Sequence, residues 1–164
     1  MRFGLGQAAP RVEDQRFLTG GGRYTDDIDL AGQAWAHMLR SPHAHARIRS
    51  VDVEAACSAP GVLAVFTGSD VAADGLGNMP SLAAKLVPLE RPDGSPMFQP
   101  PCPALVRDKV AFVGDYVAFV VAESRSQAQE AAELVEVDYE PLPANVRTAD
   151  AGAGGAPAGW DDCP

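Results

Sequence analysis

The sequence predicts a mixed α/β domain of the α+β class, built on a mixed sheet. Three adjoining patterns within residues 110–139 predict this class: an apolar run at 116–122, a helical pattern after Ser124, and an alternating pattern at 135–139. A continuous apolar run is typical of a strand that is covered on both faces. We therefore expect a strand-helix-strand unit around which the rest of the chain packs, with a right-handed crossover if its strands are parallel.

A tight turn is expected just before this central strand. Residues 110–113 form a second short apolar run, and Gly114 and Asp115 separate it from the run at 116–122. Glycine at the first central position of a two-residue turn is typical of a type II′ hairpin. The sequence therefore predicts that the two apolar runs pair as a hairpin.

The helix that follows has both a start signal and an apolar face. Ser124 and Gln127 have the spacing of a capping box. In the strand after the helix, Val137 is expected to point inward and Glu136 toward water, and Pro141 is expected to end the strand. The predicted inward side of the helix, at helical spacing, consists of Ala128, Ala131, Ala132 and Val135.

Two strands and a helical turn are expected earlier in the chain. Residues 33–40 alternate in a way that gives a strand with two usable faces. The next strand, at 43–53, changes the parity of its alternation at Ser50, which predicts a β-bulge or a strand end there. Asp52 is the expected N-cap of a helical turn that reaches Cys57.

A further strand at 62–66, with a short helix capped by Ser69, precedes a long irregular segment at 76–103 that is rich in proline. A loop of this length in a compact domain usually carries a function or a partner surface. We expect its apolar side chains, together with a tryptophan near the end of the chain, to be short of cover. These residues are Leu82, Leu86, Leu89, Met97, Phe98 and Trp160.

The chain is expected to have three parts. Residues 1–30 have little periodicity and many turn formers, and we interpret them as an irregular N-terminal segment. Residues 31–145 form the domain itself, with the proline-rich loop at 76–103 inside it. Residues 146–164 are a tail of small residues that leads toward a further domain.

Composition narrows the class of protein. The chain has 164 residues, and its 46% hydrophobic and 21% charged residues are values of a globular protein. The net charge of −9 argues against a nucleic acid or an anionic membrane as partner. No apolar run approaches the ~20 residues of a membrane span, and no secretory signal is visible. Because Cys57, Cys102 and Cys163 form neither a disulfide framework nor a zinc motif, we expect a reduced, cytoplasmic protein.

Three histidines are the best candidate metal ligands. His43 and His45 stand two residues apart on a predicted strand, and His37 lies on the preceding strand. A three-histidine set could bind zinc or another transition metal. Arg47 and Arg49 extend the same predicted face and would repel a cation, so we expect structural histidines rather than a metal site.

Other candidate sites are weaker. The glycines at 20–22 suggest a phosphate cradle but lack the lysine pattern of one, so a plain turn is expected. The acidic run at 26–29 lacks the glycine and glutamate of a calcium loop. Cys102 has no basic neighbour that would activate it as a nucleophile. We therefore assign no catalytic, cofactor-binding or metal-binding residue to this chain.

Four blocks carry a resemblance to a known family. RVEDQRFLTGGGRYTDDI (11–28), RSPHAHARIRSVD (40–52), PGVLAVFTGSDV (60–71) and the block at 108–144 closely resemble, in order and spacing, the start of one family of large subunits. It is the molybdenum-binding large subunit of the bacterial-type xanthine dehydrogenase, aldehyde oxidase and carbon monoxide dehydrogenase family. The resemblance implies an α/β-hammerhead fold. Gly21, where a side chain is more usual, is a small departure.

The resemblance also implies where the chemistry lies. In that family, glycine-rich loops grip the molybdopterin–molybdenum cofactor and a glutamate acts as base in regions that follow this segment, while iron–sulfur and FAD groups sit on other domains or subunits. The resemblance thus implies a non-catalytic structural part, fragment or separate subunit, of a molybdenum hydroxylase that oxidises aldehydes, purines, carbon monoxide or similar small substrates. The alternative is a stand-alone hammerhead module for binding. The expected partner is the cofactor-binding molybdenum domain or subunit, or a second copy of the chain.

Overall fold

The computed structural model describes residue 6 and residues 11–82, 86–87, 90–91 and 93–161. Cys163 and Leu89, which the sequence singled out, lie outside the described residues. Contacts divide the chain into two compact units, residues 1–33 and residues 34–164. Within the described residues, no helix combines the length and the apolar composition needed to cross a membrane.

In its described residues the first unit contains the short α-helix α1 (Asp14–Leu18) and the 3-10 turn η1 (Thr25–Asp27). Its organising contact is a stack of Phe17 on Tyr24, with ring centroids 5.4 Å apart. Gly22 lies against Phe17 so closely that an added Cβ would stand 2.4 Å from a ring carbon. Glycine is therefore required at this position by packing.

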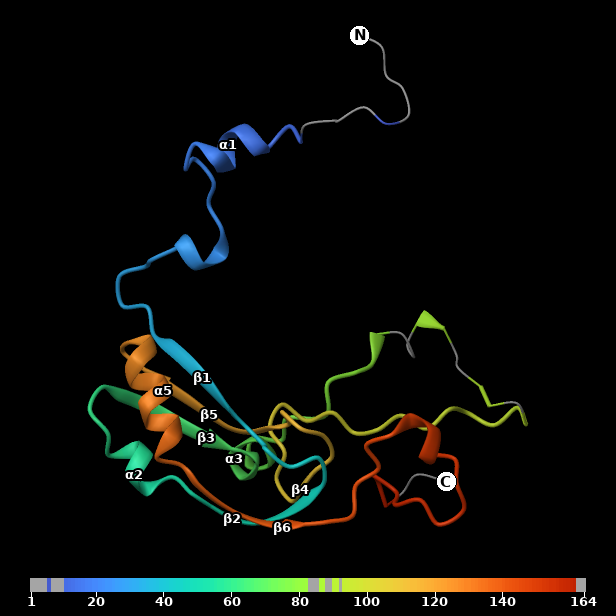
Figure 1. Cartoon of the computed structure of the whole chain (residues 1–164). Helices are drawn as coiled ribbons and strands as arrows, with labels where there is room; N and C mark the ends of the chain where they lie inside the picture. Colours follow the sequence, from blue (N-terminus) through green and yellow to red (C-terminus); the bar gives the residue numbers. More distant parts are fainter. Residues whose placement is uncertain (1–5, 7–10, 83–85, 88–89, 92, 162–164) are drawn as a thin grey trace. The chain divides into compact units, whose positions relative to one another are not determined.

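The second unit is built from two three-stranded sheets. One sheet has the strand order β1 (Trp35–Arg40), β5 (Tyr116–Ala122), β3 (Val62–Thr67), and we call it sheet A (Figure 1). Sheet B has the order β4 (Lys109–Val110), β2 (Ala46–Asp52), β6 (Glu136–Pro141). Every strand pair in both sheets is antiparallel. The remaining helical elements are α2 (Glu54–Cys57), α3 (Gly68–Ala73), α5 (Arg125–Glu133) and η2 (Thr148–Asp150).

The central strand and the helix after it agree with the sequence. β5 lies in the middle of sheet A, and four of its residues, Val117, Ala118, Val120 and Ala122, are fully buried. The predicted inward side of α5 is buried, since its three alanines and Val135 belong to one core cluster or to the buried set. Alanine has no bulk beyond Cβ, so the helix backbone can approach the sheet closely. The α+β class is confirmed.

The helix begins where the sequence predicts. The hydroxyl of Ser124 accepts a hydrogen bond from the Gln127 N–H at 3.4 Å and donates to the amide oxygen of Gln127 at 2.6 Å. The cap is thus present, although the glutamine side chain bonds the serine hydroxyl rather than its backbone. Such a cap satisfies one of the free N–H groups of the first turn.

The expected hairpin is wrong, and the condition for a right-handed crossover, parallel strands on either side of α5, is not met. β4 has only two residues and pairs with β2, while β5 pairs with β1 and β3. Gly114 has φ of 91° and occupies the third position of a turn in which the Asp115 N–H donates to the Phe112 carbonyl. Positive φ at the third position is the geometry of a type II turn, which redirects the chain instead of folding it back as a hairpin. The chain therefore leaves sheet B at β4 and enters sheet A at β5, and α5 connects the two sheets rather than two strands of one.

The structure confirms the predicted bulge in β2 and corrects the predicted cap of α3. The register of β2 against β6 shifts between Ile48 and Ser50, so the β-bulge predicted from the parity change is confirmed. The cap of α3 is Thr67, not Ser69: the Thr67 N–H and hydroxyl both donate to the Asp70 carboxylate at 2.7 Å. A threonine paired with an acidic residue three positions later makes a reciprocal cap, which a serine two residues further on cannot.

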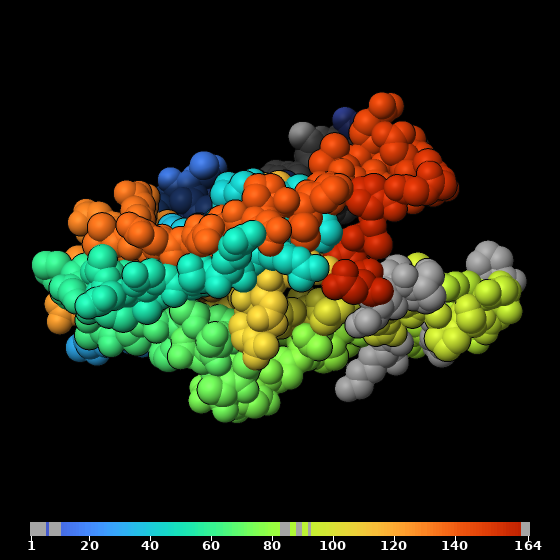
Figure 2. All heavy atoms as spheres, turned by 90° about the horizontal axis from the view of Figure 1, so that it is seen from below, coloured from blue at the N-terminus to red at the C-terminus, as the bar shows by residue number. Residues whose placement is uncertain are grey.

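Two core clusters hold the second unit together. One lies between α5 and sheet A, and the other surrounds Ala46, Val110 and Val117. Val51 and Val137 pack against both clusters, so these two half-buried valines of sheet B join the halves of the core. In Figure 2 the strands that carry them, β2 and β6, run side by side across the face in view.

Val137→Asp is expected to lower the free energy of unfolding by about 3 kcal/mol or more, because it places an unpaired charge between the two clusters. The neighbouring Glu136→Lys, on the exposed side of the same strand, is expected to change it by about 0.5 kcal/mol or less. Urea midpoints of the two variants measure the difference. Equal damage by both would contradict the assignment of faces.

Candidate functional site

The three histidines do not come together as a metal site. His45 lies just before β2, and its Nδ1 is 2.8 Å from the carbonyl oxygen of Pro143. The ring of His43 packs against Tyr139 with centroids 4.9 Å apart. His37 lies in β1, in register with Val120 of β5. Within the described residues no group of three His, Cys, Asp or Glu side chains comes together that could hold a metal ion.

The glycine turn and the acidic run of the first unit form hydrogen bonds with neighbouring residues of the same segment. The Gly21 N–H donates to the Arg16 carbonyl at 2.8 Å, which closes the end of α1. The Asp27 carboxylate accepts a hydrogen bond from the Tyr24 N–H at 2.8 Å. Both segments therefore serve as turns, as the sequence favours.

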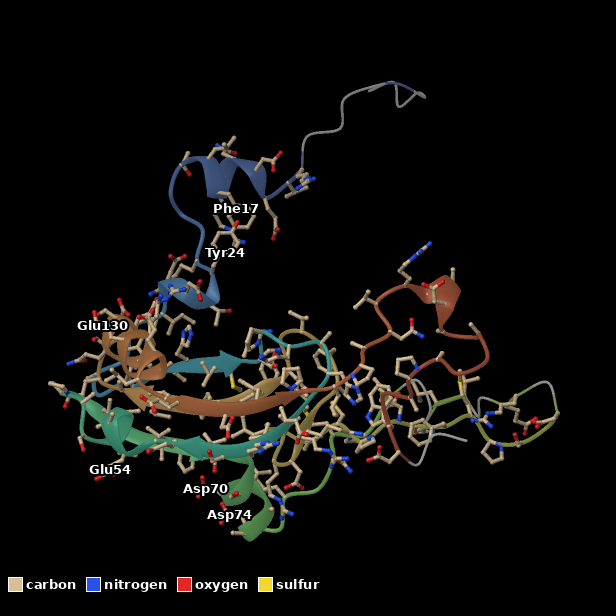
Figure 3. All side chains as sticks on the ribbon, turned by 60° about the horizontal axis from the view of Figure 1, so that its bottom comes forward. Phe17, Tyr24, Glu54, Asp70, Asp74 and Glu130 are labelled. Carbon is tan, nitrogen blue, oxygen red and sulfur yellow. The ribbon has the colours of Figure 1, made fainter. Side chains whose placement is uncertain are left out.

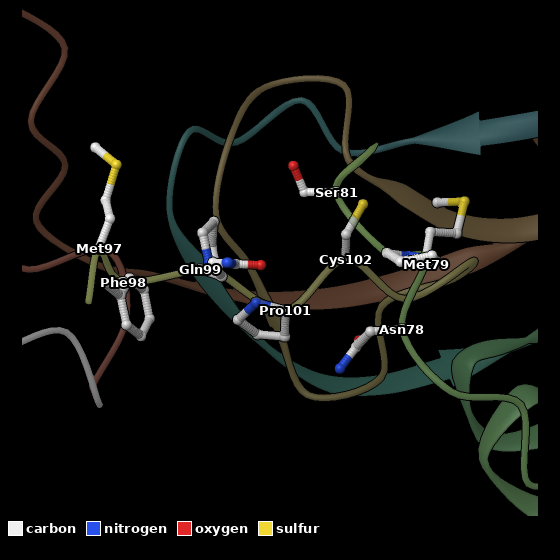
Figure 4. A pocket seen from close by; sticks show the side chains of 10 residues that line it. Asn78, Met79, Ser81, Met97, Phe98, Gln99, Pro101 and Cys102 are labelled. Atoms are coloured by element: carbon white, nitrogen blue, oxygen red, sulfur yellow. The ribbon is translucent and has the colours of Figure 1, made fainter. Parts of the chain in front are cut away.

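A cavity of about 600 Å³ surrounds Cys102 in the proline-rich segment (Figure 4). Two stretches of chain, residues 78–81 and 97–102, line the cavity. They are joined by a hydrogen bond that the Met79 N–H donates to the Cys102 carbonyl oxygen at 2.7 Å. Among the described residues that line the cavity there is no histidine, lysine or arginine, and the Cys102 thiol is exposed. The lining residues are Asn78, Met79, Pro80, Ser81, Met97, Phe98, Gln99, Pro100, Pro101 and Cys102.

The last described residues of the chain, Trp160 and Asp161, contact the proline-rich segment and β4. Trp160 and Phe98 pack with ring centroids 6.3 Å apart, and both are half-buried. Lys109 of β4 and Asp161 form an ion pair at 3.2 Å. The expectation that Phe98 and Trp160 lack cover is therefore wrong, because each covers the other.

The corner between the two sheets holds the most buried polar groups. Ser41 and Asp115 are 2% and 8% exposed. The Ser41 N–H donates to the Asp115 carbonyl at 2.9 Å, and the Gly114 N–H donates to the Ser41 carbonyl at 2.8 Å. The Asp115 carboxylate accepts a hydrogen bond from the Ala111 N–H at 3.0 Å. The connection between β1 and β2 is thus locked to the connection between β4 and β5.

Burial sets the electrostatics of this corner. It raises the pKa of the Asp115 carboxyl, and hydrogen bonds from the backbone of Ala111 and Tyr116 only partly oppose the rise. Burial also raises the pKa of the Tyr139 hydroxyl; a hydrogen bond to Ser41 lowers it and the nearby Asp115 charge raises it further. The sequence pattern did not indicate this corner, because it predicted Asp115 to lie in a hairpin turn between residues 110–113 and 116–122.

The other unusual surface is the face of sheet A that points away from α5. Side chains alternate along a strand, so Phe119 points opposite to the buried Ala118 and Val120. Met38 of β1 and Phe66 of β3 are both in register with Phe119, and the Phe66 and Phe119 rings are 6.4 Å apart. We call Met38, Phe119 and Phe66 the apolar row. The expectation that β5 is covered on both faces holds fully only on the α5 side, since Phe119 and Val121 are half-buried.

A groove of about 310 Å³ runs between the apolar row and α3. Phe66 remains 41% exposed and Leu76 59% exposed at its edge. The carboxylates of Asp70 in α3 and of Asp74, the residue after that helix, stand at the same groove, and both are labelled beside α3 in Figure 3. Besides the apolar row, the groove is lined by Asp70, Val71, Asp74, Leu76, Ala104 and Leu105.

Comparison with known proteins gives one consistent match. Residues 19–143 match the model of the family described as aldehyde oxidase and xanthine dehydrogenase, a/b hammerhead domain. The carbon monoxide dehydrogenase large chain of Afipia carboxidovorans is 44% identical over 140 residues, or 85% of this chain. The nicotine 6-hydroxylase large subunit of Paenarthrobacter nicotinovorans is 38% identical over 84% of this chain. The chain spans 16% of the length of each of these two relatives.

Solved structures agree with the sequence match. A reconstituted carbon monoxide dehydrogenase from Oligotropha carboxidovorans superposes with a TM-score of 0.75 at 43% identity, over 94% of this chain and 17% of that one. An aldehyde oxidoreductase from Desulfovibrio desulfuricans superposes with a TM-score of 0.78 at 27% identity, over 97% of this chain and 17% of that one. The fold is therefore shared across these enzymes.

The raised pKa of Asp115 predicts how stability depends on pH. Because the pKa of this carboxyl is higher in the folded than in the unfolded state, its stabilising share is complete below the unfolded pKa of about 4 and is lost as pH rises through the folded pKa. Asp115→Asn keeps an oxygen for the Ala111 N–H and is expected to flatten this loss. Urea unfolding from pH 4 to pH 8 measures it, and a variant with an unchanged pH slope would contradict the assignment.

Proposed function

Since the chain belongs to the aldehyde oxidase and xanthine dehydrogenase family through its a/b hammerhead domain, we propose that it is a non-catalytic structural part of a molybdenum hydroxylase. The relatives named above are large chains of such enzymes, and this chain corresponds to a small share of each. The complete enzyme would oxidise a small substrate of the kind its relatives act on, such as carbon monoxide, an aldehyde or a purine.

The observation that carries this proposal is uncovered apolar surface on a well-packed domain. The proline-rich segment exposes Leu82 by 69%, Leu86 by 72% and Met97 by 53%. The apolar row of sheet A is open on the side away from α5. A contiguous apolar surface on a soluble domain usually marks a partner site. A scaffold that docks against the cofactor-bearing part of an enzyme would have these features.

The described residues of this chain offer no set of groups that fits the molybdopterin–molybdenum cofactor itself. Among the described residues no group of metal-binding side chains comes together, and the glycine turn at 20–22 is occupied by Arg16 and Phe17. We therefore place the cofactor, and the iron–sulfur and FAD groups, on other domains or subunits. The partner is then the molybdenum-binding part of the enzyme.

A chimera tests the proposal. Residues 19–143 replace the matching segment in the large chain of the Afipia carboxidovorans carbon monoxide dehydrogenase. The chimera is expected to retain molybdenum, measured by mass spectrometry of the metal, and to oxidise carbon monoxide above background. The control chimera carries Val137→Asp, which should lose both. A well-folded chimera that binds no molybdenum would favour the stand-alone binding module.

The purified chain alone is expected to contain no molybdenum and to reduce no dye with aldehydes, purines or carbon monoxide. The reason is the lack of a cofactor site in its described residues, not a failure to fold. Metal analysis and a dye-reduction assay measure these outcomes. Stoichiometric molybdenum in the isolated chain would contradict the proposal.

A further inference from the structure

We propose that the groove between the apolar row and α3 docks a positively charged apolar segment, one with leucine-like side chains beside lysine or arginine. The inference rests on the proposed function, since the segment would belong to the molybdenum-binding part of the enzyme. It adds the face that is used and the chemistry of the partner.

The groove has the shape and surface of a docking site. Its floor is the apolar row, a continuous line of side chains across the three strands of sheet A, and α3 forms one wall. Phe66 is 41% exposed, and Leu76 at the edge is 59% exposed. In the space-filling view of Figure 2, the green segment around α3 forms a ridge at the lower margin of the molecule. Covering such side chains gives about 25 cal/mol per Å² of apolar surface removed from water.

The charge at the groove decides the kind of partner. Asp70 lies in α3, Asp74 is the residue that follows the helix four positions later, and both line the groove. The hydrogen bonds of Thr67 to Asp70 lower the pKa of that carboxyl, so it stays ionised. Neither aspartate forms an ion pair within the described part of the chain, and no lysine or arginine lines the groove.

This negative rim argues against a second copy of the chain as occupant. Two copies docked through the same face would bring the aspartates of both α3 helices near each other, between molecules that each carry a net charge of −9. Like charges across an interface disfavour the wrong partner, and opposite charges steer the right one. An apolar segment flanked by lysine or arginine would pack its apolar side chains on the apolar row and place its positive charges beside Asp70 and Asp74.

Two synthetic amphipathic peptides test the inference on the isolated chain. They share one leucine face and differ on the other, which carries lysine in one peptide and glutamate in the other. The lysine peptide is expected to bind and to shift the amide resonances of Phe66, Val71 and Phe119 in ¹⁵N spectra, and added salt should weaken it. The glutamate peptide is expected to bind at least roughly tenfold more weakly.

Matched variants separate docking at this groove from attraction to net charge. Asp74→Asn is expected to weaken the lysine peptide roughly two- to fivefold, the effect of one exposed charge pair, whereas Glu130→Gln on α5 makes the same charge change and should leave binding as it was. Phe66→Ser should weaken binding of the lysine peptide further, whereas Leu134→Ser should not, although Leu134 is 45% exposed and Phe66 41%.

The peptide experiments test docking at the groove independently of the chimera. Equal loss in Asp74→Asn and Glu130→Gln, resonance shifts elsewhere on the surface, or equal binding of the two peptides would overturn the inference. The proposed function would stand in that case if the chimera retains molybdenum. A chimera without molybdenum, with the lysine peptide seated on the groove, would instead remove the proposed function.

Discussion

Two backbone hydrogen bonds between Ser41 and the Gly114–Asp115 pair hold the domain in its shape. They join the β1–β2 connection to the β4–β5 connection, two of the places where the chain passes from one sheet to the other, and the buried Asp115 carboxyl fastens the same corner to Ala111. Buried backbone groups must find partners, so a corner of this kind has few alternative arrangements. The positive φ of Gly114 lets the chain change direction there at no steric cost.

The rest of the architecture depends on that corner. With the two crossovers fixed, β5 lies between β1 and β3, and β2 lies between β4 and β6. Val51 and Val137 can then pack against both core clusters, which makes one continuous core from two small sheets. The same arrangement packs α5 on one face of sheet A, while only the short α3 stands beside the other face. The apolar row on its other face is therefore a direct consequence of how the sheets are joined.

The sequence predicts the elements of this fold well and their pairing poorly. The α5 helix, its cap at Ser124, the central strand and the bulge near Ser50 follow from patterns within a few residues, and all are confirmed. The expected hairpin failed because strand pairing is decided by distant residues: Ser41, more than seventy positions away, holds Gly114 in the turn. Alternation likewise shows that a strand has two faces but not which of them the fold covers. For that reason the sequence did not predict that the apolar row would be open. It also did not predict the contact of Ser41 with Gly114 and Asp115, which joins the two sheets.

We propose that this domain docks on a molybdenum-binding partner through the open face of sheet A. Hydroxyl-radical footprinting read by mass spectrometry tests it most directly, by comparing the isolated chain with the assembled chimeric enzyme. Met38 and Phe66 are expected to be oxidised in the isolated chain and strongly protected in the assembly. Leu134, near the end of α5, is expected to be oxidised to the same degree in both. Unchanged oxidation of Met38 and Phe66 in an assembly that contains molybdenum would contradict it.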